Sequence, residues 1–126
     1  MNGAMLAFVG DAYFDLQVRE ALIRSGVNRS ARFHQLAVFY VSAKAQAHVL
    51  DRLVADGFLS AEELDVVRKG RNVKSNTVPK HTDIATYAKS TAFEALIGFL
   101  YLSEASARLD EIVARSMEIR DEGVER

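Results

Sequence analysis

The chain has 126 residues, of which 49% are hydrophobic and 26% charged, with a formal net charge of −1. This length and composition are typical of one globular domain with its own core. The absence of cysteine excludes disulfides, thiolate metal sites and a cysteine nucleophile. No stretch approaches the roughly 18 to 20 apolar residues of a membrane span, and residues 1–10 lack the basic segment of a secretory signal. We therefore expect a cytoplasmic protein.

The spacing of apolar residues predicts helices throughout. Apolar side chains recur at steps of three and four residues, and no segment shows the alternation of a strand. Ser60 and Glu63 form the sequence pattern of a capping box. The expected helices cover about residues 5–24, 30–54, 60–68, 83–102 and 107–120. The predicted fold class is therefore all-α, one domain over residues 1–126, with residues 121–126 as a frayed tail.

A basic segment lies between the third and fourth predicted helices. From Val66 to Thr82 there are five cations (Arg68, Lys69, Arg71, Lys74 and Lys80) and no acid. Residues 70–82 lack helical periodicity and contain small polar side chains, which is unusual for so long a stretch of a small domain. Cations with neutral hydrogen-bonding groups suit contacts to nucleic-acid phosphates. The alternative is an exposed loop that is simply polar.

Two carboxylates lie in apolar surroundings. Asp11 and Glu94 each occur within a hydrophobic run, where an unpaired buried carboxylate would cost several kcal/mol. Gly10 and Gly98 lie inside helical patterns, where glycine costs about 1 kcal/mol relative to alanine. Glycine at such positions indicates close approach of another backbone. Two helices crossing at these glycines would bring the carboxylates together as a metal site.

The pattern alone leaves other interpretations open. Either carboxylate could be a solvated residue at the edge of an apolar helix face or half of an ion pair. Asp15 and Arg19, four residues apart, fit a structural ion pair in the same way. The three histidines, His34, His48 and His81, have neither the spacing nor the neighbours of a zinc site.

Two short motifs resemble the ribonuclease III family. Phe8–Ala12 resembles the F-L-G-D-A centre of its signature helix, and Phe93–Gly98 resembles its second motif, E-A-L-I-G. Residues 68–83 resemble the loop R-G-R-N-x-K-S…T-x-P-K-x-T-D of the short Mini-III subfamily. The similarity extends from residue 2 to about residue 109. The chain is identified as a member of this subfamily, which has the catalytic domain without the double-stranded-RNA-binding domain.

The resemblance implies a metal-dependent endoribonuclease that cleaves double-stranded RNA, with a role in maturing large-subunit (23S) ribosomal RNA precursors. Asp11 and Glu94 would be the catalytic residues and the ligands of Mg²⁺, or of Mn²⁺ in its place. The family acts as a two-fold homodimer, with Phe8 at the interface. The residues implied in RNA binding are Arg68, Arg71, Asn72, Lys74, Ser75 and Lys80.

The chain departs from the longer ribonuclease III proteins at two positions. Ala7 and Thr91 occupy positions where those proteins have a further Glu and Asp. Mini-III proteins share this reduced set, so the departure indicates the subfamily. Two alternatives remain at this stage: an inert ribonuclease III-like module that binds RNA or ribosomes, and a helical adaptor domain.

Overall fold

The structure is a computed structural model that describes residues 1–26, 30–74 and 78–124. This part of the chain is all-helical, with no strand, which confirms the predicted fold class. Its helices are α1 (Gly3–Arg24), α2 (Ser30–Val41), α3 (Ala43–Ala55), α4 (Ala61–Arg71), α5 (Ile84–Leu102) and α6 (Ser106–Glu122). None of the described helices has the length and apolar character to cross a membrane.

Side-chain caps determine where several helices begin. The Asn2 carboxamide accepts a hydrogen bond from the Met5 amide at 2.9 Å, and α1 starts at the next residue. The predicted capping box is confirmed, because Ser60 and Glu63 each accept a hydrogen bond from the other's backbone amide. At the start of α5 the Asp83 carboxylate accepts a hydrogen bond from the Thr86 amide. These caps satisfy backbone N–H groups that have no partner within the helix.

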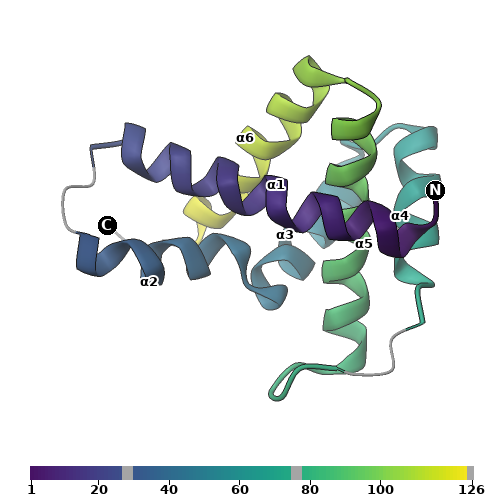
Figure 1. The fold of residues 1–126 in the computed structure, drawn as a ribbon, viewed down its shortest axis with the longest axis horizontal. Coiled ribbons are helices and arrows are strands. Elements are labelled where there is room, and N and C mark those ends of the chain that lie inside the picture. Colours follow the sequence, from purple (N-terminus) through teal and green to yellow (C-terminus); the bar gives the residue numbers. More distant parts are fainter. Residues whose placement is uncertain (27–29, 75–77, 125–126) are drawn as a thin grey trace.

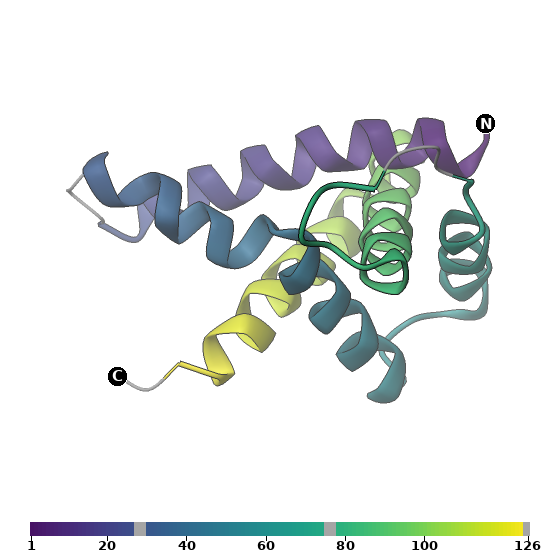
Figure 2. The ribbon, with the colours of Figure 1, turned by 90° about the horizontal axis from the view of Figure 1, so that it is seen from below.

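The predicted helix over residues 30–54 is wrong in one respect, since it is two helices. Ser42 has an extended backbone (φ −62°, ψ 155°) and its hydroxyl accepts a hydrogen bond from the Ala45 amide at 3.2 Å. Serine competes in this way with the backbone hydrogen bonds of a continuous helix. The chain therefore turns between α2 and α3 (Figure 2).

Helix α5 forms the centre of the fold. Its neighbours in Figures 1 and 2 are α1, which crosses it, and α3, α4 and α6, which pack around it. Phe93, Leu96 and Ile97 on α5 are fully buried, and the Phe93 ring packs edge-on against Phe14 of α1 with centroids 4.9 Å apart. A side chain at the surface of this helix thus has a rigid support.

Glycines allow α1 and α5 to cross in backbone contact. A Cβ atom on Gly10 would lie 1.7 Å from the Glu94 carbonyl oxygen, and one on Gly98 would lie 1.9 Å from that of Leu6. Neither distance is compatible with any residue other than glycine. The crossing expected from these two glycines is confirmed.

Helix α6 is joined to the rest of the molecule by polar contacts. Arg108 donates hydrogen bonds at 2.8 Å to both oxygens of the buried Glu63 carboxylate on α4. This ion pair keeps the pKa of Glu63 below its ordinary value, chiefly through the Arg108 hydrogen bond. The helix also runs two residues beyond the predicted end, because Asp121 accepts a hydrogen bond from Tyr40 and Glu122 one from Arg52. Residues 121 and 122, predicted as part of a tail, are therefore helical, and residues 125–126 lie outside the described part of the chain.

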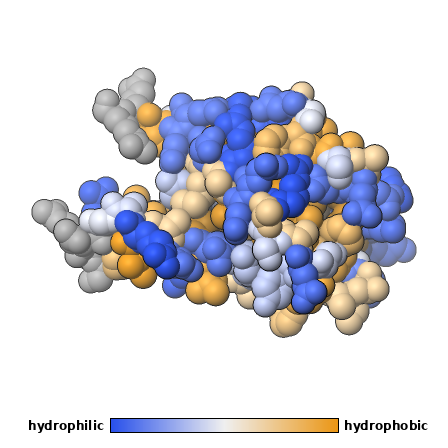
Figure 3. Space-filling view, turned by 90° about the horizontal axis from the view of Figure 1, so that it is seen from above, coloured by the Kyte–Doolittle hydropathy of each residue, from blue (hydrophilic) through white to orange (hydrophobic). Residues whose placement is uncertain are grey.

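The surface combines polar and apolar areas. Figure 3 shows orange apolar patches between strongly polar side chains on one face of the molecule. Several large hydrophobic side chains on α1 are exposed, and Phe8 is the most exposed at 83%. The others on this helix that are more than half exposed are Met5, Leu16 and Ile23.

Candidate active site

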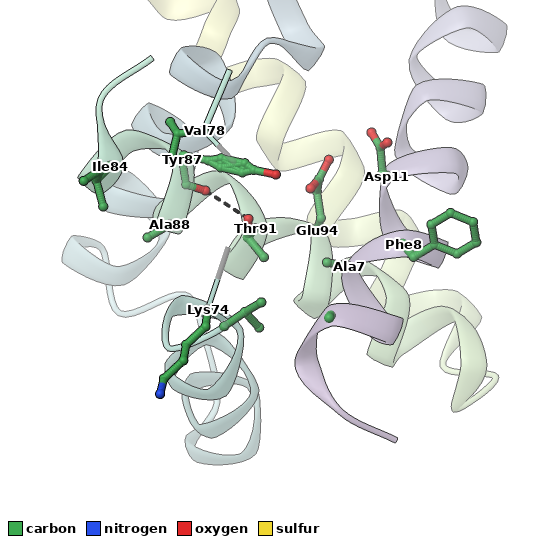
Figure 4. Close-up of a pocket in the computed structure, with 12 residues that line it drawn as sticks. Ala7, Phe8, Asp11, Lys74, Val78, Ile84, Tyr87, Ala88, Thr91 and Glu94 are labelled. Carbon is green, nitrogen blue, oxygen red and sulfur yellow. Dashed lines mark hydrogen bonds between the residues drawn. The ribbon is translucent and has the colours of Figure 1, made fainter. Parts of the chain in front are cut away.

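Asp11 and Glu94 line the same open cleft. Asp11 is on α1 and Glu94 on α5, and Figure 4 shows both carboxylates on the same side of the helix crossing. Asp11 is exposed and Glu94 is partly buried. The cleft has a volume of about 430 Å³. The other residues that line it are Ala4, Ala7, Phe8, Val73, Lys74, Val78, Ile84, Tyr87, Ala88 and Thr91.

The surroundings of Glu94 oppose its ionisation. Burial, a hydrogen bond with Asp11 and the charge of Asp11 together raise the pKa of Glu94 to about 9. A hydrogen bond from the Gln46 side chain acts in the opposite direction. A carboxyl with such a pKa is protonated at neutral pH unless a cation compensates the charge of the pair. A cation bound beside the two acids would relieve the repulsion that opposes ionisation of Glu94.

The residues present fit a hard divalent cation. Two adjacent carboxylates supply oxygen ligands, and Mg²⁺ is usually held by one or two carboxylates while it keeps several waters. The described residues contain no cluster of three or more His, Cys, Asp or Glu that could hold a metal. Ala7 and Thr91, where longer relatives have further acids, line this cleft without adding a carboxylate. A metal here would therefore depend on Asp11 and Glu94 and on water.

The predicted RNA-binding residues have different surroundings. Lys74 lines the cleft, and in Figure 4 its ammonium group points away from the two carboxylates. Arg71, Asn72 and Lys80 are exposed, and Ser75 lies outside the described residues. Arg68, the remaining residue of the set, forms an ion pair with Asp65 on the same helix.

An acid just before the basic segment neutralises part of it. Asp65 pairs with Arg68 at 2.8 Å and with Lys69 at 3.2 Å along α4. These two hydrogen bonds hold the pKa of Asp65 below its ordinary value. The acid-free segment of the sequence runs from Val66 to Thr82 and excludes Asp65, so it did not predict this pairing. It leaves Arg71 and Lys80 as more available cations than Arg68.

Tyr87 was missed as a residue of the site. Its hydroxyl points toward the Glu94 carboxyl in Figure 4, and its carbonyl accepts a hydrogen bond from the Thr91 hydroxyl at 3.0 Å. Tyr87, Thr91 and Glu94 are spaced by four and three residues, so they share one face of α5. That spacing from Glu94 would have placed Tyr87 in the cleft before the structure was known.

Gln46 was also missed in the reasoning from single residues. It is 1% exposed, lies on α3, and accepts a hydrogen bond from Ser90 of α5 at 2.9 Å. No local sequence signal distinguishes it from an exposed glutamine, because its burial follows from the packing of α3 against α5. Its hydrogen bond to Glu94 makes it part of the site.

Sequence comparison agrees with these features. Residues 4–105 match the family model described as the Ribonuclease III domain. The chain is 48% identical to a Mini-ribonuclease 3 of Brevibacillus brevis over 94% of this chain and 87% of the relative. A Mini-ribonuclease 3 of Staphylococcus aureus is 40% identical over 97% of this chain and 91% of the relative. The chain belongs to the Mini-ribonuclease 3 family.

A solved structure has the same fold. A crystal structure of a protein from Fusobacterium nucleatum superposes with a TM-score of 0.81 at 27% identity, covering 93% of this chain and 92% of that chain. As a Mini-ribonuclease 3, the protein is an endoribonuclease of the ribonuclease III type, a class that acts on double-stranded RNA. Asp11 and Glu94 both lie within the matched domain.

Proposed function

We propose that this protein cleaves double-stranded RNA with a divalent cation, Mg²⁺ or Mn²⁺, held by Asp11 and Glu94. The observation that supports the proposal is the pair of carboxylates in one open cleft, with the pKa of Glu94 raised to about 9. A buried carboxyl beside a second acid is destabilised when ionised, and a cation relieves that destabilisation. Binding of the metal would therefore displace the proton that Glu94 otherwise holds.

Each residue of the site has a distinct part in the proposed hydrolysis. A bound Mg²⁺ supplies Lewis acidity at the scissile phosphate and lowers the pKa of a water molecule. Asp11 and Glu94 fix the position of the cation relative to α1 and α5, whose backbones touch at Gly10. The Tyr87 hydroxyl, directed into the cleft, offers a hydrogen bond to an RNA oxygen.

The RNA backbone is held by the exposed residues beside the cleft in this proposal. Arg71, Asn72 and Lys80 contact phosphates, with Lys74 at the rim and Ser75 in the same segment of sequence. Arg68 contributes less because it pairs with Asp65. Duplex RNA is recognised mainly by its A-form shape and 2′-hydroxyls. The proposed contacts are accordingly independent of base sequence.

The proposal includes a two-fold homodimer. Phe8 is 83% exposed on α1, and Figure 4 shows its ring directed away from the carboxylate pair. An exposed aromatic ring of this size is typical of an interface anchor. An isologous dimer would place one site against each strand of a duplex.

We further propose that the natural substrate is a precursor of large-subunit (23S) ribosomal RNA. The support is the Mini-III-like sequence of residues 68–83. Bacterial ribosome assembly takes place in the cytoplasm, so this substrate would locate the protein there.

The test is cleavage of an end-labelled RNA duplex in Mg²⁺, in Mn²⁺ and in EDTA. The native chain is expected to cut in either metal and not in EDTA, and Glu94→Gln is expected to lose at least a thousandfold in kcat, since a metal ligand is removed. Glu118→Gln, an exposed acid on α6, is the matched control and should cut normally. Duplex binding without cutting by the native chain in both metals would overturn the proposal and favour an inert RNA-binding module.

A further inference from the structure

A buried glutamine lies behind the Glu94 carboxyl group. Gln46 is 1% exposed and hydrogen bonds to Glu94 from α3, the helix that packs against α5. We infer that Gln46 is a positioning residue, whose fixed amide holds the Glu94 carboxylate in the orientation required to bind the metal. This inference rests on the proposed function, because it concerns the same carboxylate.

The neighbours of Gln46 determine which way its amide faces. Its Nε2 atom donates to the Val41 carbonyl oxygen at 3.2 Å, and its Oε1 atom accepts from the Ser90 hydroxyl at 2.9 Å. The Val41 carbonyl can only accept, so the NH₂ group must face it. A flipped amide would place oxygen against oxygen. The orientation is therefore set by groups outside the metal site.

The second hydrogen on Nε2 is left for Glu94. An NH₂ group has two donors, and one is used by Val41. The remaining donor accounts for the hydrogen bond between Gln46 and Glu94. A carboxylate oxygen that accepts from an anchored amide has less freedom to rotate. Glu94 is thereby aligned on the side of the cleft that Asp11 also faces (Figure 4).

Ser90 completes the arrangement on the same helix. Ser90 and Glu94 are four residues apart on α5, so one turn of helix presents both to Gln46. The Ser90 hydroxyl is buried and directed to the glutamine oxygen at 2.9 Å. A chain of hydrogen bonds thus runs from Ser90 through Gln46 to Glu94. Groups that orient a metal ligand in this way commonly contribute tenfold or more to metal affinity.

The experiment measures Mn²⁺ binding to the RNA-free protein by titration calorimetry, together with kcat and KM for duplex cleavage. Gln46→Met keeps the length of the side chain and removes its donors. We expect it to weaken Mn²⁺ binding about tenfold and to lower kcat, with KM for RNA within about twofold of native. Ser90→Ala should weaken Mn²⁺ binding about threefold, because the amide loses one of its anchors.

A buried serine elsewhere provides the matched control. Ser116 on α6 is 1% exposed and donates to the Ile112 carbonyl oxygen at 2.6 Å, as a buried hydroxyl remote from the cleft. Ser116→Ala is expected to bind Mn²⁺ and cleave RNA like the native chain. Its melting temperature, compared with those of the other variants, measures the effect of lost stability alone.

The outcomes separate the inference from the proposed function. Native Mn²⁺ affinity in folded Gln46→Met would overturn the positioning role and leave Gln46 as a packing residue. If Gln46→Met does not fold, Ser90→Ala decides, and unchanged Mn²⁺ affinity in that variant overturns the role. If the native chain and Glu94→Gln bind Mn²⁺ equally, the proposed metal site itself is wrong and the inference falls with it.

Discussion

The α-carbon of Gly10 packs directly against the main-chain carbonyl of Glu94, so that a methyl group at Gly10 would lie 1.7 Å from the carbonyl oxygen. Asp11 follows Gly10 in the chain. The backbone contact that sets the distance between α1 and α5 is therefore formed by the residues that present the two carboxylates. Structure and site depend on the same crossing.

Gly10→Ala is expected to destabilise the fold by about 2–3 kcal/mol and to reduce cleavage. The added methyl meets backbone atoms, which cannot move aside as a flexible side chain can, and this outweighs the roughly 1 kcal/mol by which alanine favours a helix. Urea unfolding and kcat measure the two effects. At Gly123 a Cβ would be 3.8 Å from the Arg120 carbonyl oxygen, so Gly123→Ala is the control and should be close to native. Native stability of Gly10→Ala would mean that the helices do not touch there.

Glu94→Gln should stabilise the metal-free protein at neutral and alkaline pH. The pKa of Glu94 is raised from an ordinary 4.5 to about 9, so between these values the folded state binds more protons than the unfolded state. The contribution of Glu94 to native stability is therefore complete below pH 4.5 and is lost as the pH rises to about 9. Glutamine cannot ionise and avoids the cost of keeping Glu94 protonated, so the free energy of unfolding should increase by about 1–3 kcal/mol at pH 7 to 8 and not change near pH 4.5.

Thermal unfolding in EDTA at several pH values measures this effect. Glu118→Gln, at an exposed position, should follow the native curve throughout. Added Mn²⁺ should then raise the melting temperature of the native chain and not of Glu94→Gln, because only the native chain has both carboxylates. A loss of stability in Glu94→Gln that is independent of pH would contradict the raised pKa.

Phe8→Asp is expected to give a folded monomer with reduced cleavage. The side chain is 83% exposed in the single chain, so the substitution removes no buried contact of that chain, while a charge at an interface core opposes association. Sedimentation equilibrium measures the oligomeric state. Val54→Asp changes another exposed apolar residue, on α3, and should leave the state unchanged. A native chain that is monomeric at all concentrations tested would refute the dimer.

Arg71→Ala and Lys80→Ala should each reduce the salt dependence of RNA binding more than Arg68→Ala does. Every cation that neutralises a phosphate contributes about one unit to the slope of log K against log salt, whereas Arg68 is paired with Asp65. Duplex affinity measured with Ca²⁺ at several salt concentrations gives these slopes. Arg24 is at the C-terminal end of α1, whereas the cleft is lined by residues from the first half of this helix. Arg24→Ala should therefore leave the slope unchanged. Equal effects of all four substitutions would argue against specific phosphate contacts.

Much of this protein was determined by the sequence itself. The three- and four-residue spacing of apolar side chains was sufficient to predict the helices. The Ser60–Glu63 pair was sufficient to predict where α4 begins. Two glycines inside apolar helices indicated a crossing, since glycine there is unfavourable without a close neighbour. The same signal placed Asp11 and Glu94 together. These features depend on local chemistry, which a single chain segment contains.

Other features were decided only by the tertiary structure. Local hydrogen bonding at Ser42 allowed either a continuous helix or a break, and the break accompanies the separate packing of α2 against α1 and of α3 against α5. The inclusion of Gln46 in the site depended on which faces of α3 and α5 met. Periodicity determines which residues share a face of a helix. The partner of each face is set by packing between segments far apart in the chain, where shape and burial are optimised for the whole core at once.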